Sequence, residues 1–532
     1  MRTRRKLLQA LAVLVMAVPA AVSAAVPAQA VGPGLLPVTV TNNTGRGEAV
    51  HLYVIGINLS TNRLGYVTKS GTFNPWPAGQ IPPSPAPDAS IAGPGNGGAT
   101  TIQFPRGFSG RVYFALGEKL KFFLTPDGLV QPAPWAAGDA NRDILFDWSE
   151  FTYNDAGLWL NSSQVDMFAV PHAVTVASAN GVTARTGEPV NNGRNAVING
   201  IKAQPGWANT VHTRADGTVL RVLAPGKAAQ AGLMNANYLD SYIASAWNAY
   251  TAKTLTVVPF TDQPNTRYFG RTSGNVMTFT NSAGQRVASF NRPSTASVWG
   301  CDGDLPAPND LVVGPISRTL CAALNRGTLG TIDTQPSTNA AQFYQNNPTN
   351  QYAKIIHQNM ADGKAYAFAF DDVGAFESLV HSGDPRSAGL ILTPFGAGGP
   401  NPPPPPGAVP LVSDWHGKCV DVPGSNFVDS APLQAWTCNG SAAQKWTFTN
   451  GTLQAGGKCM DVAAGSTANG AAVQLYSCNG TGAQQFVLSG AGDLVNPQAN
   501  KCVDIKDWNA GDGARLQLWE CAGTANQKWH KG

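Results

Sequence analysis

Cysteine is missing from the first 300 residues of this 532-residue chain, and charged residues make up only 13% of it. The cysteines that follow form no C-x-x-C pair and no Cys/His zinc pattern. The sequence also lacks a G-x-S-x-G elbow, an H-E-x-x-H helix, a P-loop and a G-x-G-x-x-G turn opening a βαβ unit. These absences exclude the usual signatures of serine hydrolases, zinc proteases and nucleotide-binding enzymes, and we expect neither a cofactor nor a metal.

A real excess of positive charge is also missing. The chain has 36 Lys and Arg against 32 Asp and Glu. Four of the basic residues, however, lie among the first six positions (Arg2, Arg4, Arg5 and Lys6). Without them the two signs balance, so we expect no nucleic-acid partner and no membrane partner.

Residues 1–30 have the layout of a secretory signal peptide. A basic start is followed by the apolar run "LLQALAVLVMAV" and by "AQA", a small-x-small cleavage site. The run is too short for an ordinary membrane span. The twin arginine in "TRRKLL" leaves the general and the twin-arginine export routes both open. We therefore expect a secreted, extracellular protein.

The eight cysteines come in pairs with regular spacing. In an exported chain this pattern predicts disulfides, each closing a loop of about 20 residues that contributes roughly 3 kcal/mol. The 58 Gly and 39 Pro favour a turn-rich, β-rich chain, and its length favours two or more domains. The predicted bonds are Cys301–Cys321, Cys419–Cys438, Cys459–Cys478 and Cys502–Cys521.

A proline-rich segment marks the main boundary. The stretch "FGAGGPNPPPPPGAVP" contains five consecutive prolines, which favour an extended polyproline II spacer. The sequence thus predicts a domain at 31–396, a linker at 397–407 and a second domain at 408–532.

The second domain contains a threefold repeat. Its copies begin "CVDV", "CMDV" and "CVDI", and each Asp is followed first by a Gln and then by a Trp or Tyr. A triplet "QKW" or "QQF" comes later in each copy, and all of these spacings are the same in the three copies. One unit of this size cannot bury a core alone, so we expect the three units to close together.

This segment resembles the ricin-type β-trefoil, the carbohydrate-binding module of family 13. The resemblance implies that each Asp accepts bonds from sugar hydroxyls and that the aromatic ring stacks on the sugar face. The alternative is that the Asp residues only shape turns, and we expect Trp446, Phe486 and Trp529 to be core residues. The third pocket is the most complete, because Ala443 and Ala483 replace the family's Asn in the other two. The implied sugar-binding residues are Asp421, Trp436 and Gln444; Asp461, Tyr476 and Gln484; and Asp504, Trp519, Asn526 and Gln527.

The first domain reads as a β-rich half followed by a mixed α/β part. Alternating strand patterns come early, in "LPVTVTN", "AVHLYVIG", "TIQFP", "GRVYFAL" and "KFFLTP". Helical patterns come later, in 237–252, "PISRTLCAALN" and "NQYAKIIHQNMA". The first of these helices is predicted to bury one face, composed of Leu239, Tyr242, Ile243, Trp247 and Tyr250.

Carboxylates remain as the candidates for acid–base chemistry, since the seven His are scattered. The stretch "ILFDWSEFTYNDAGLWLNSSQVDMF" holds four of them beside two Trp. Glycoside hydrolysis needs two: one protonated group donates to the leaving oxygen, and the other activates water or attacks the sugar.

The first domain resembles glycoside hydrolase family 64, the laminaripentaose-producing endo-β-1,3-glucanases. The resemblance rests on the stretch above and on "DGTVLR", "GPISRTLCAALNR", "QNMADGKAYAFAFDDVG" and "ESLVHSGDPR", in order along 36–395. It implies a thaumatin-like β-barrel or sandwich beside a mixed α/β part, with a crescent-shaped groove. It also implies inversion at the anomeric carbon, with Glu150 of "WSE" as the acid and Asp166 of "QVDM" as the base. We expect one β-hairpin to carry both acids.

The neighbours of these acids are predicted from the same resemblance and from strand parity. Thr152, Asn154 and Trp159 match groove residues of the family, and positions 150, 152 and 154 of a strand share one face. Trp159 is favoured as a sugar-stacking ring over a core residue. The remaining predictions place Trp148 in the groove or the core, Asp371 and Asp372 on sugar or in a cap or turn, and Asp147 and Asp155 in turns or on the surface.

The sequence therefore predicts a secreted, monomeric endo-β-1,3-glucanase that binds β-1,3-glucan and carries a sugar-binding trefoil. Two alternatives stay open at this point. One is a non-catalytic thaumatin-like or lectin-type glucan-binding protein, because a fold does not fix a function. The other is a lectin whose large domain is a passenger.

Overall fold

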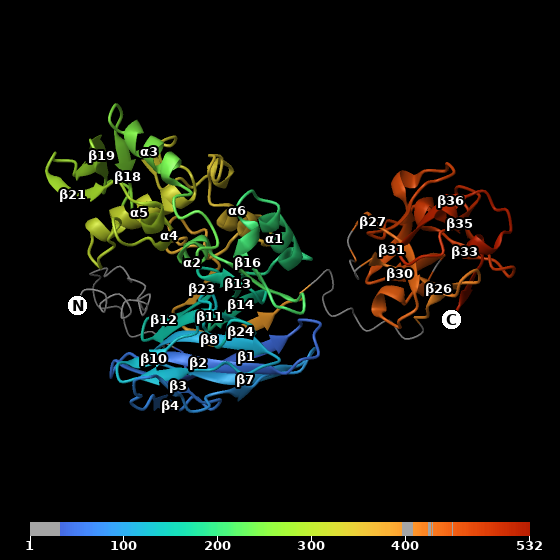
Figure 1. Ribbon diagram of the computed structural model, residues 1–532, viewed down its shortest axis with the longest axis horizontal. Coiled ribbons are helices and arrows are strands. Elements are labelled where there is room, and N and C mark those ends of the chain that lie inside the picture. The colour runs from blue at the N-terminus through green and yellow to red at the C-terminus, as the bar shows by residue number, and fades with distance from the viewer. Residues whose placement is uncertain (1–31, 396–407, 424–426, 428, 450) are drawn as a thin grey trace. The chain divides into compact units, whose positions relative to one another are not determined.

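The computed structural model divides the chain into two compact units, with the main boundary between Thr393 and Pro394 (Figure 1). The predicted signal peptide (1–30) and linker (397–407) lie outside the described residues. No helix in the described part of the chain is long and apolar enough to cross a membrane. The structure describes residues 32–395, 408–423, 427, 429–449 and 451–532.

The first unit contains two packed β-sheets, most of whose strands are drawn in blue to teal in Figure 1. Strand alternation produces this packing, because each strand turns its apolar side chains toward the opposite sheet. Phe104 of one sheet stacks on Phe151 of the other, with ring centroids 3.7 Å apart. One sheet has the order β15 (Thr183–Thr186), β14 (His172–Ser178), β24 (Pro385–Leu392), β1 (Leu35–Asn42) and β7 (Ala99–Pro105).

The second sheet carries the stretch with the four carboxylates. Its central hairpin joins β11 to β12, and β8 lies on the other side of β11. The predicted strands over 36–42, 49–56, 101–105 and 110–116 are confirmed, to within a few residues at their ends. The order is β23 (Leu379–Ser382), β12 (Gly157–Ser162), β11 (Leu145–Asn154), β8 (Phe108–Leu116), β2 (Val50–Asn58), β3 (Arg63–Val67) and β4 (Phe73–Pro75), with β6 (Ile91–Ala92) beside β2.

Two small sheets share an apolar cluster with this hairpin sheet. The first contains part of the predicted strand "KFFLTP", shortened to Phe123–Thr125. The second follows directly on Asp166 and leads into helix α2 (Pro225–Gln230). Their strands are β10 (Gly128–Val130), β9 (Phe123–Thr125) and β5 (Ser84–Pro85), and β13 (Met167–Phe168), β17 (Val219–Leu223) and β16 (Val211–Thr213).

The mixed α/β part is built around one apolar cluster. The predicted helices are confirmed as α3 (Asp240–Ala249), α5 (Val313–Asn325) and α6 (Gln351–Gln358). All five residues of the predicted buried face of α3 and its flanks are at most 9% exposed. Helices α1 (Gly193–Lys202) and α4 (Thr295–Gly300) complete this part, together with a sheet of β21 (Arg286–Asn291), β20 (Val276–Thr280), β19 (Tyr268–Ser273), β18 (Leu255–Val257) and β22 (Thr334–Gln335).

The second unit confirms the predicted threefold closure. Trp446, Phe486 and Trp529 are at most 3% exposed and share one core, as predicted. Three equivalent hairpins surround it: β26 (Lys418–Asp421) with β28 (Gln434–Thr437), β31 (Lys458–Val462) with β32 (Val473–Tyr476), and β35 (Lys501–Ile505) with β36 (Ala514–Trp519). The other strands are β25 (Leu411–Ser413), β27 (Ala431–Pro432), β29 (Thr447–Thr449), β30 (Thr452–Ala455), β33 (Val487–Leu488), β34 (Leu494–Asn496) and β37 (Trp529–Lys531).

All four predicted disulfides are present. Cys301 follows α4 and bonds to Cys321 inside α5, so this bridge fastens two helices of the mixed part. The other three occupy equivalent positions in the three trefoil units, with the same sequence separation of 19 in each.

Candidate active site and sugar-binding pockets

One face of β11 changes from buried to open at Glu150. Phe146 and Trp148 lie on this face and are at most 2% exposed, because a separate apolar cluster covers them. Glu150, Thr152 and Asn154 follow on the same face and are partly exposed. The predicted sharing of one face by positions 150, 152 and 154 is thus confirmed, and Trp148 belongs to the core.

The cross-strand register brings polar and aromatic side chains beside Glu150. Asn161 of β12 is opposite Glu150, and its Oδ1 accepts the Glu150 backbone N–H at 3.3 Å. Thr152 is opposite Trp159, whose indole lies 4.4 Å from the His381 ring. A partly exposed ring in the row that contains Glu150 is available for stacking on a sugar.

Asp166 lies beyond the end of β12 and just before β13. The predicted hairpin therefore carries Glu150 but not Asp166, which corrects the expectation for the second acid. Its position is fixed by its own main chain, since its carbonyl accepts the Ala224 N–H at 3.0 Å. Its side chain is 13% exposed.

Arg111 of β8 connects the two acids. Its Nε and Nη2 each lie 2.9 Å from Glu150 Oε1, and Nη2 lies 3.7 Å from Asp166 Oδ2. Lys227 Nζ of α2 lies 3.2 Å from Asp166 Oδ1. Burial alone lowers the pKa of Arg111, but Tyr113, Glu150 and Asp166 outweigh it and raise that pKa above its ordinary value. Two cations therefore face two carboxylates in a partly open site.

Asp147 is a buried scaffold carboxylate, so its predicted place in a turn or on the surface is wrong. It is 1% exposed and accepts the N–H groups of Trp148, Ala169 and Val170 at 2.8–3.0 Å. Burial raises its pKa to about 7, against these hydrogen bonds. Asp155 lies in the exposed turn between β11 and β12, as predicted.

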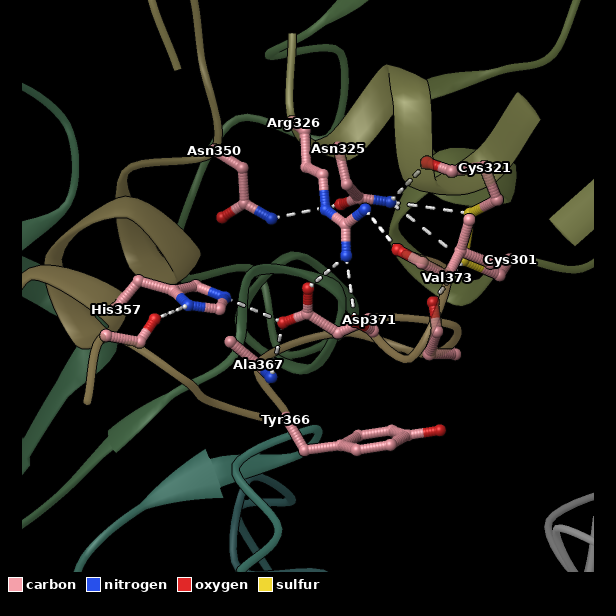
Figure 2. Close-up of polar contacts among 12 residues, drawn as sticks. Cys301, Cys321, Asn325, Arg326, Asn350, His357, Tyr366, Ala367, Asp371 and Val373 are labelled. Atoms are coloured by element: carbon pink, nitrogen blue, oxygen red, sulfur yellow. Dashed lines mark hydrogen bonds and ion pairs between the residues drawn. A yellow bond between two sulfur atoms is a disulfide. The ribbon is translucent and has the colours of Figure 1, made fainter. Parts of the chain in front are cut away.

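Asp371 is also buried, so direct contact with sugar, one of its two predicted roles, is wrong. Figure 2 shows its carboxylate between Arg326, at 3.0 Å, and His357, at 2.9 Å, with the Ala367 N–H on the same oxygen as His357. Its side chain is 0% exposed, so no oxygen is left for a ligand. The neighbouring Asp372 is exposed and stays a candidate substrate contact.

Sequence reasoning missed Arg111, Lys227 and Asn161. Arg111 was detectable as a lone charge in the alternating strand "GRVYFAL", but nothing near Lys227 signalled its approach to Asp166.

Each trefoil unit holds one carboxylate, 5% exposed, on a strand that pairs with the strand carrying one exposed aromatic ring. Asp421 accepts from Gln434 at 2.8 Å and from Gln444 at 3.1 Å. Asp461 and Asp504 have the same partners one and two repeats later. The rings are exposed by 38, 36 and 42% and belong to Trp436, Tyr476 and Trp519.

The third pocket differs by one donor. Asn526 Nδ2 donates to Asp504 Oδ2 at 2.7 Å, whereas buried Ala443 and Ala483 take this place in the other units. Each Asp also accepts from the Gln of the neighbouring strand, and these glutamines were visible in the repeat but were not assigned to the pockets. They are Gln434, Gln474 and Gln517.

Two acids joined by one guanidinium, together with three repeated carboxylates and three exposed aromatic rings, are typical of a carbohydrate-active protein. The chain belongs to the β-1,3-glucanase family, glycoside hydrolase family 64, whose family model matches residues 34–392. The ricin-type β-trefoil lectin domain matches residues 408–529.

Similar proteins agree with this assignment. Glucan endo-1,3-β-glucosidases of Arthrobacter sp. (strain YCWD3) and Cellulosimicrobium cellulans are each 46% identical over 467 residues, which is 85% of this chain and 84% of each relative. The solved structure of a laminaripentaose-producing β-1,3-glucanase in complex with laminaritetraose is 54% identical, with a TM-score of 0.66, and covers 68% of this chain and 99% of its own. A glucanase domain of the same family from Clostridium beijerinckii is 25% identical, with a TM-score of 0.58, over 68% of this chain and 98% of its own.

Proposed function

We propose that this protein is a secreted endo-β-1,3-glucanase that hydrolyses β-1,3-glucan with inversion and uses Glu150 and Asp166 as its catalytic pair. The observation that carries the proposal is the bridge from Arg111 to both carboxylates on the open face of β11. Family membership supplies the substrate class, because the relatives above are named as glucan endo-1,3-β-glucosidases.

In the proposed reaction Glu150 donates a proton to the glycosidic oxygen while Asp166 takes one from the attacking water. Because one nitrogen of Arg111 reaches both acids, their nearest oxygens are separated by at most ~6.6 Å, and inverting pairs are roughly 6.5–9.5 Å apart. This upper limit also includes the roughly 5–5.5 Å of retaining pairs, so the assignment of inversion rests on the family resemblance.

The glucan is proposed to lie along the open face that Thr152, Asn154 and Trp159 share with Glu150. Thr152 is held by Ser109 at 2.8 Å, and the Asn154 side chain accepts the Ala156 N–H at the turn. Asp372 is proposed as a further sugar contact. The crescent groove, the thaumatin-like architecture and laminaripentaose as the main product are also part of the proposal, and they rest on the family resemblance.

The trefoil is proposed to bind glucan through its three exposed rings and their carboxylates. Retention of the catalytic domain near an insoluble polymer raises its local concentration. The four disulfides support an oxidising, extracellular location. The signal peptide at 1–30, the linker at 397–407 and a monomeric state complete the proposal.

The test is incubation of the purified protein with laminarin and curdlan, with the anomeric form of the products measured at early times. We expect oligosaccharides, mainly the pentasaccharide, released first as the α-anomer. Glu150→Gln and Asp166→Asn are each expected to lower kcat by at least about 10³-fold, whereas Asp155→Asn, the exposed control, keeps full activity. Binding without any product from folded protein would support the non-catalytic alternative.

A further inference from the structure

Arg111 is held rigidly before any substrate arrives. It lies on β8, between β11 and β2 in the hairpin sheet, and its guanidinium lies over the Trp148 ring, 4.6 Å from the ring centroid. Trp148 is itself 2% exposed and packed in an apolar cluster. A guanidinium on such a platform has little freedom to turn, so it presents its donors in one direction.

The contacts to Glu150 are asymmetric. Both close contacts from Arg111, at 2.9 Å, end on Oε1. Within the described residues no hydrogen bond reaches Glu150 Oε2. A protonated carboxyl group still accepts hydrogen bonds on its carbonyl oxygen while its other oxygen carries the proton. Arg111 can therefore keep Oε1 as the acceptor and leave Oε2 to carry the proton toward the sugar.

Asp166 is shared by two cations. Lys227 Nζ lies 3.2 Å from Oδ1 and Arg111 Nη2 lies 3.7 Å from Oδ2. Lys227 has its own aromatic support, since its Nζ lies 4.4 Å from the Trp135 ring centroid. Lys227 is thus the nearer cation for Asp166, and Arg111 is the nearer cation for Glu150.

We propose that Arg111 is a positioning residue of the hydrolytic step: it directs Glu150 Oε2 to the glycosidic oxygen and stabilises the carboxylate that proton donation creates. The inference rests on the proposed roles of Glu150 and Asp166. The proton leaves Oε2 for the leaving oxygen as the C1–O bond breaks. Water bonds to C1 and gives its proton to Asp166. Negative charge therefore moves from Asp166 to Glu150, and the fixed Arg111 is closer to the place where the charge ends.

The acids are also faced by groups from other elements. Asn161 of β12 and Tyr366, in the segment before β23, lie on the side of Glu150; Lys227 of α2 and Tyr352 of α6 lie on the side of Asp166. Burial raises the pKa values of both tyrosines well above their ordinary value, so these two groups stay neutral. Around the two acids, the described residues supply positive charge through Arg111 and Lys227.

The test is steady-state kinetics of Arg111→Gln and Arg111→Lys on soluble laminarin, with pH–rate profiles. For Arg111→Gln we expect kcat to fall about 10²-fold and KM to change by less than about threefold. The alkaline limb of the profile should move to higher pH, because the carboxylate that proton donation creates loses its nearest cation. Arg111→Lys keeps the positive charge but loses the planar guanidinium with its forked N–H donors. It should therefore lose about tenfold in kcat and retain the position of the alkaline limb.

Three comparisons make the result decisive. Arg185→Gln removes an exposed arginine that pairs with Glu188 on the surface, and it should match the wild type. Arg111→Gln combined with Glu150→Gln should be no slower than Glu150→Gln alone, because Arg111 acts through that acid. A melting temperature for each variant separates loss of folding from loss of rate.

An unchanged kcat with an unmoved alkaline limb in a folded Arg111→Gln protein would overturn the inference. So would a full additional loss in the double variant. Failure of the proposed function looks different: Glu150→Gln and Asp166→Asn would then keep their activity. If Arg111→Gln does not fold, the kinetics of Arg111→Lys decide, and wild-type kcat in that variant would contradict the role of the fork.

Discussion

At the residue scale, Asp147 shows how burial changes what a carboxylate does. It lies three positions before Glu150 in β11, yet its side chain reaches the backbone of Ala169 and Val170, just after Asp166 and β13. It therefore supports the segment that carries the proposed base. Burial raises its pKa to about 7, so between about pH 4 and 7 the folded state binds this proton more tightly than the unfolded chain.

We therefore expect the Asp147 carboxyl to cost stability as the pH rises from 4 to 7, by an upper limit of roughly 4 kcal/mol. The Asn in Asp147→Asn does not titrate. The variant should therefore be less destabilised relative to wild type at pH 7.5 than at pH 4.5. Urea unfolding of the catalytic unit at both values measures this. Asp155→Asn is the exposed control and should show no such trend. If Asp147→Asn and wild type differ in stability by the same amount at both pH values, Asp147 does not have a raised pKa in the folded protein.

The role of a single residue could be predicted from the sequence when it depends on near neighbours in the chain, and could not when it depends on distant ones. Strand parity placed Glu150, Thr152 and Asn154 correctly on one face, because alternation is a local property. The burial of Asp371 beside Arg326, and the approach of Lys227 to Asp166, join residues that are far apart in the chain. No local pattern contains that information.

At the element scale, the segment from Tyr366 to Phe376 is held by one cation and one histidine. Arg326 binds the carboxylate and the carbonyl of Asp371 (Figure 2). Its guanidinium also lies over the rings of Phe343, Phe368 and Phe376. Burial would lower the pKa of His357, but the Asp371 carboxylate outweighs it and raises that pKa. The ion pair with His357 therefore contributes stability at low pH that is lost as the pH rises through the raised value.

His357→Gln should therefore lose most stability, relative to wild type, below about pH 6.5, the ordinary pKa of histidine, and lose less by pH 9. Thermal unfolding at pH 6 and pH 9 tests this. The matched control is His381→Gln, because burial lowers the pKa of His381 and the neutral ring is the folded form. The loss for His381→Gln should therefore be slightly smaller at pH 6 than at pH 9, the opposite trend, because the proton taken up at pH 6 favours the unfolded wild-type chain. A loss for His357→Gln that grows with pH would contradict the ion pair.

Elements themselves were well predicted where their periodicity was strong. The alternating strands of both sheets and helices α3, α5 and α6 appear where the sequence places them. The prediction that one hairpin carries both acids was wrong, because "NSSQVD" leaves β12 and crosses to a different small sheet. An unbroken run of Asn, Ser and Gln does not reveal where a strand ends.

At the scale of the whole molecule, the chain combines one catalytic unit with three sugar-pocket candidates. The repeat spacing predicted the trefoil core and its disulfides, because threefold symmetry imposes the same contacts three times. The number of working pockets is a separate matter. Only Asp504 has an Asn donor beside its two Gln partners, so we expect the third pocket to bind sugar most tightly.

Replacement of Trp436, Tyr476 and Trp519 by Ala together should therefore reduce activity on insoluble curdlan about tenfold or more at low enzyme concentration, while activity on soluble laminarin changes by less than about twofold. The rings are exposed, so their loss costs the trefoil core little. Trp519→Ala alone should account for more of the effect than Trp436→Ala or Tyr476→Ala. Pull-down on curdlan measures binding, and product release on both substrates measures rate. An equal loss on soluble and insoluble glucan would contradict tethering, because a tether changes the local concentration of the enzyme and leaves the chemistry at Glu150 and Asp166 unchanged.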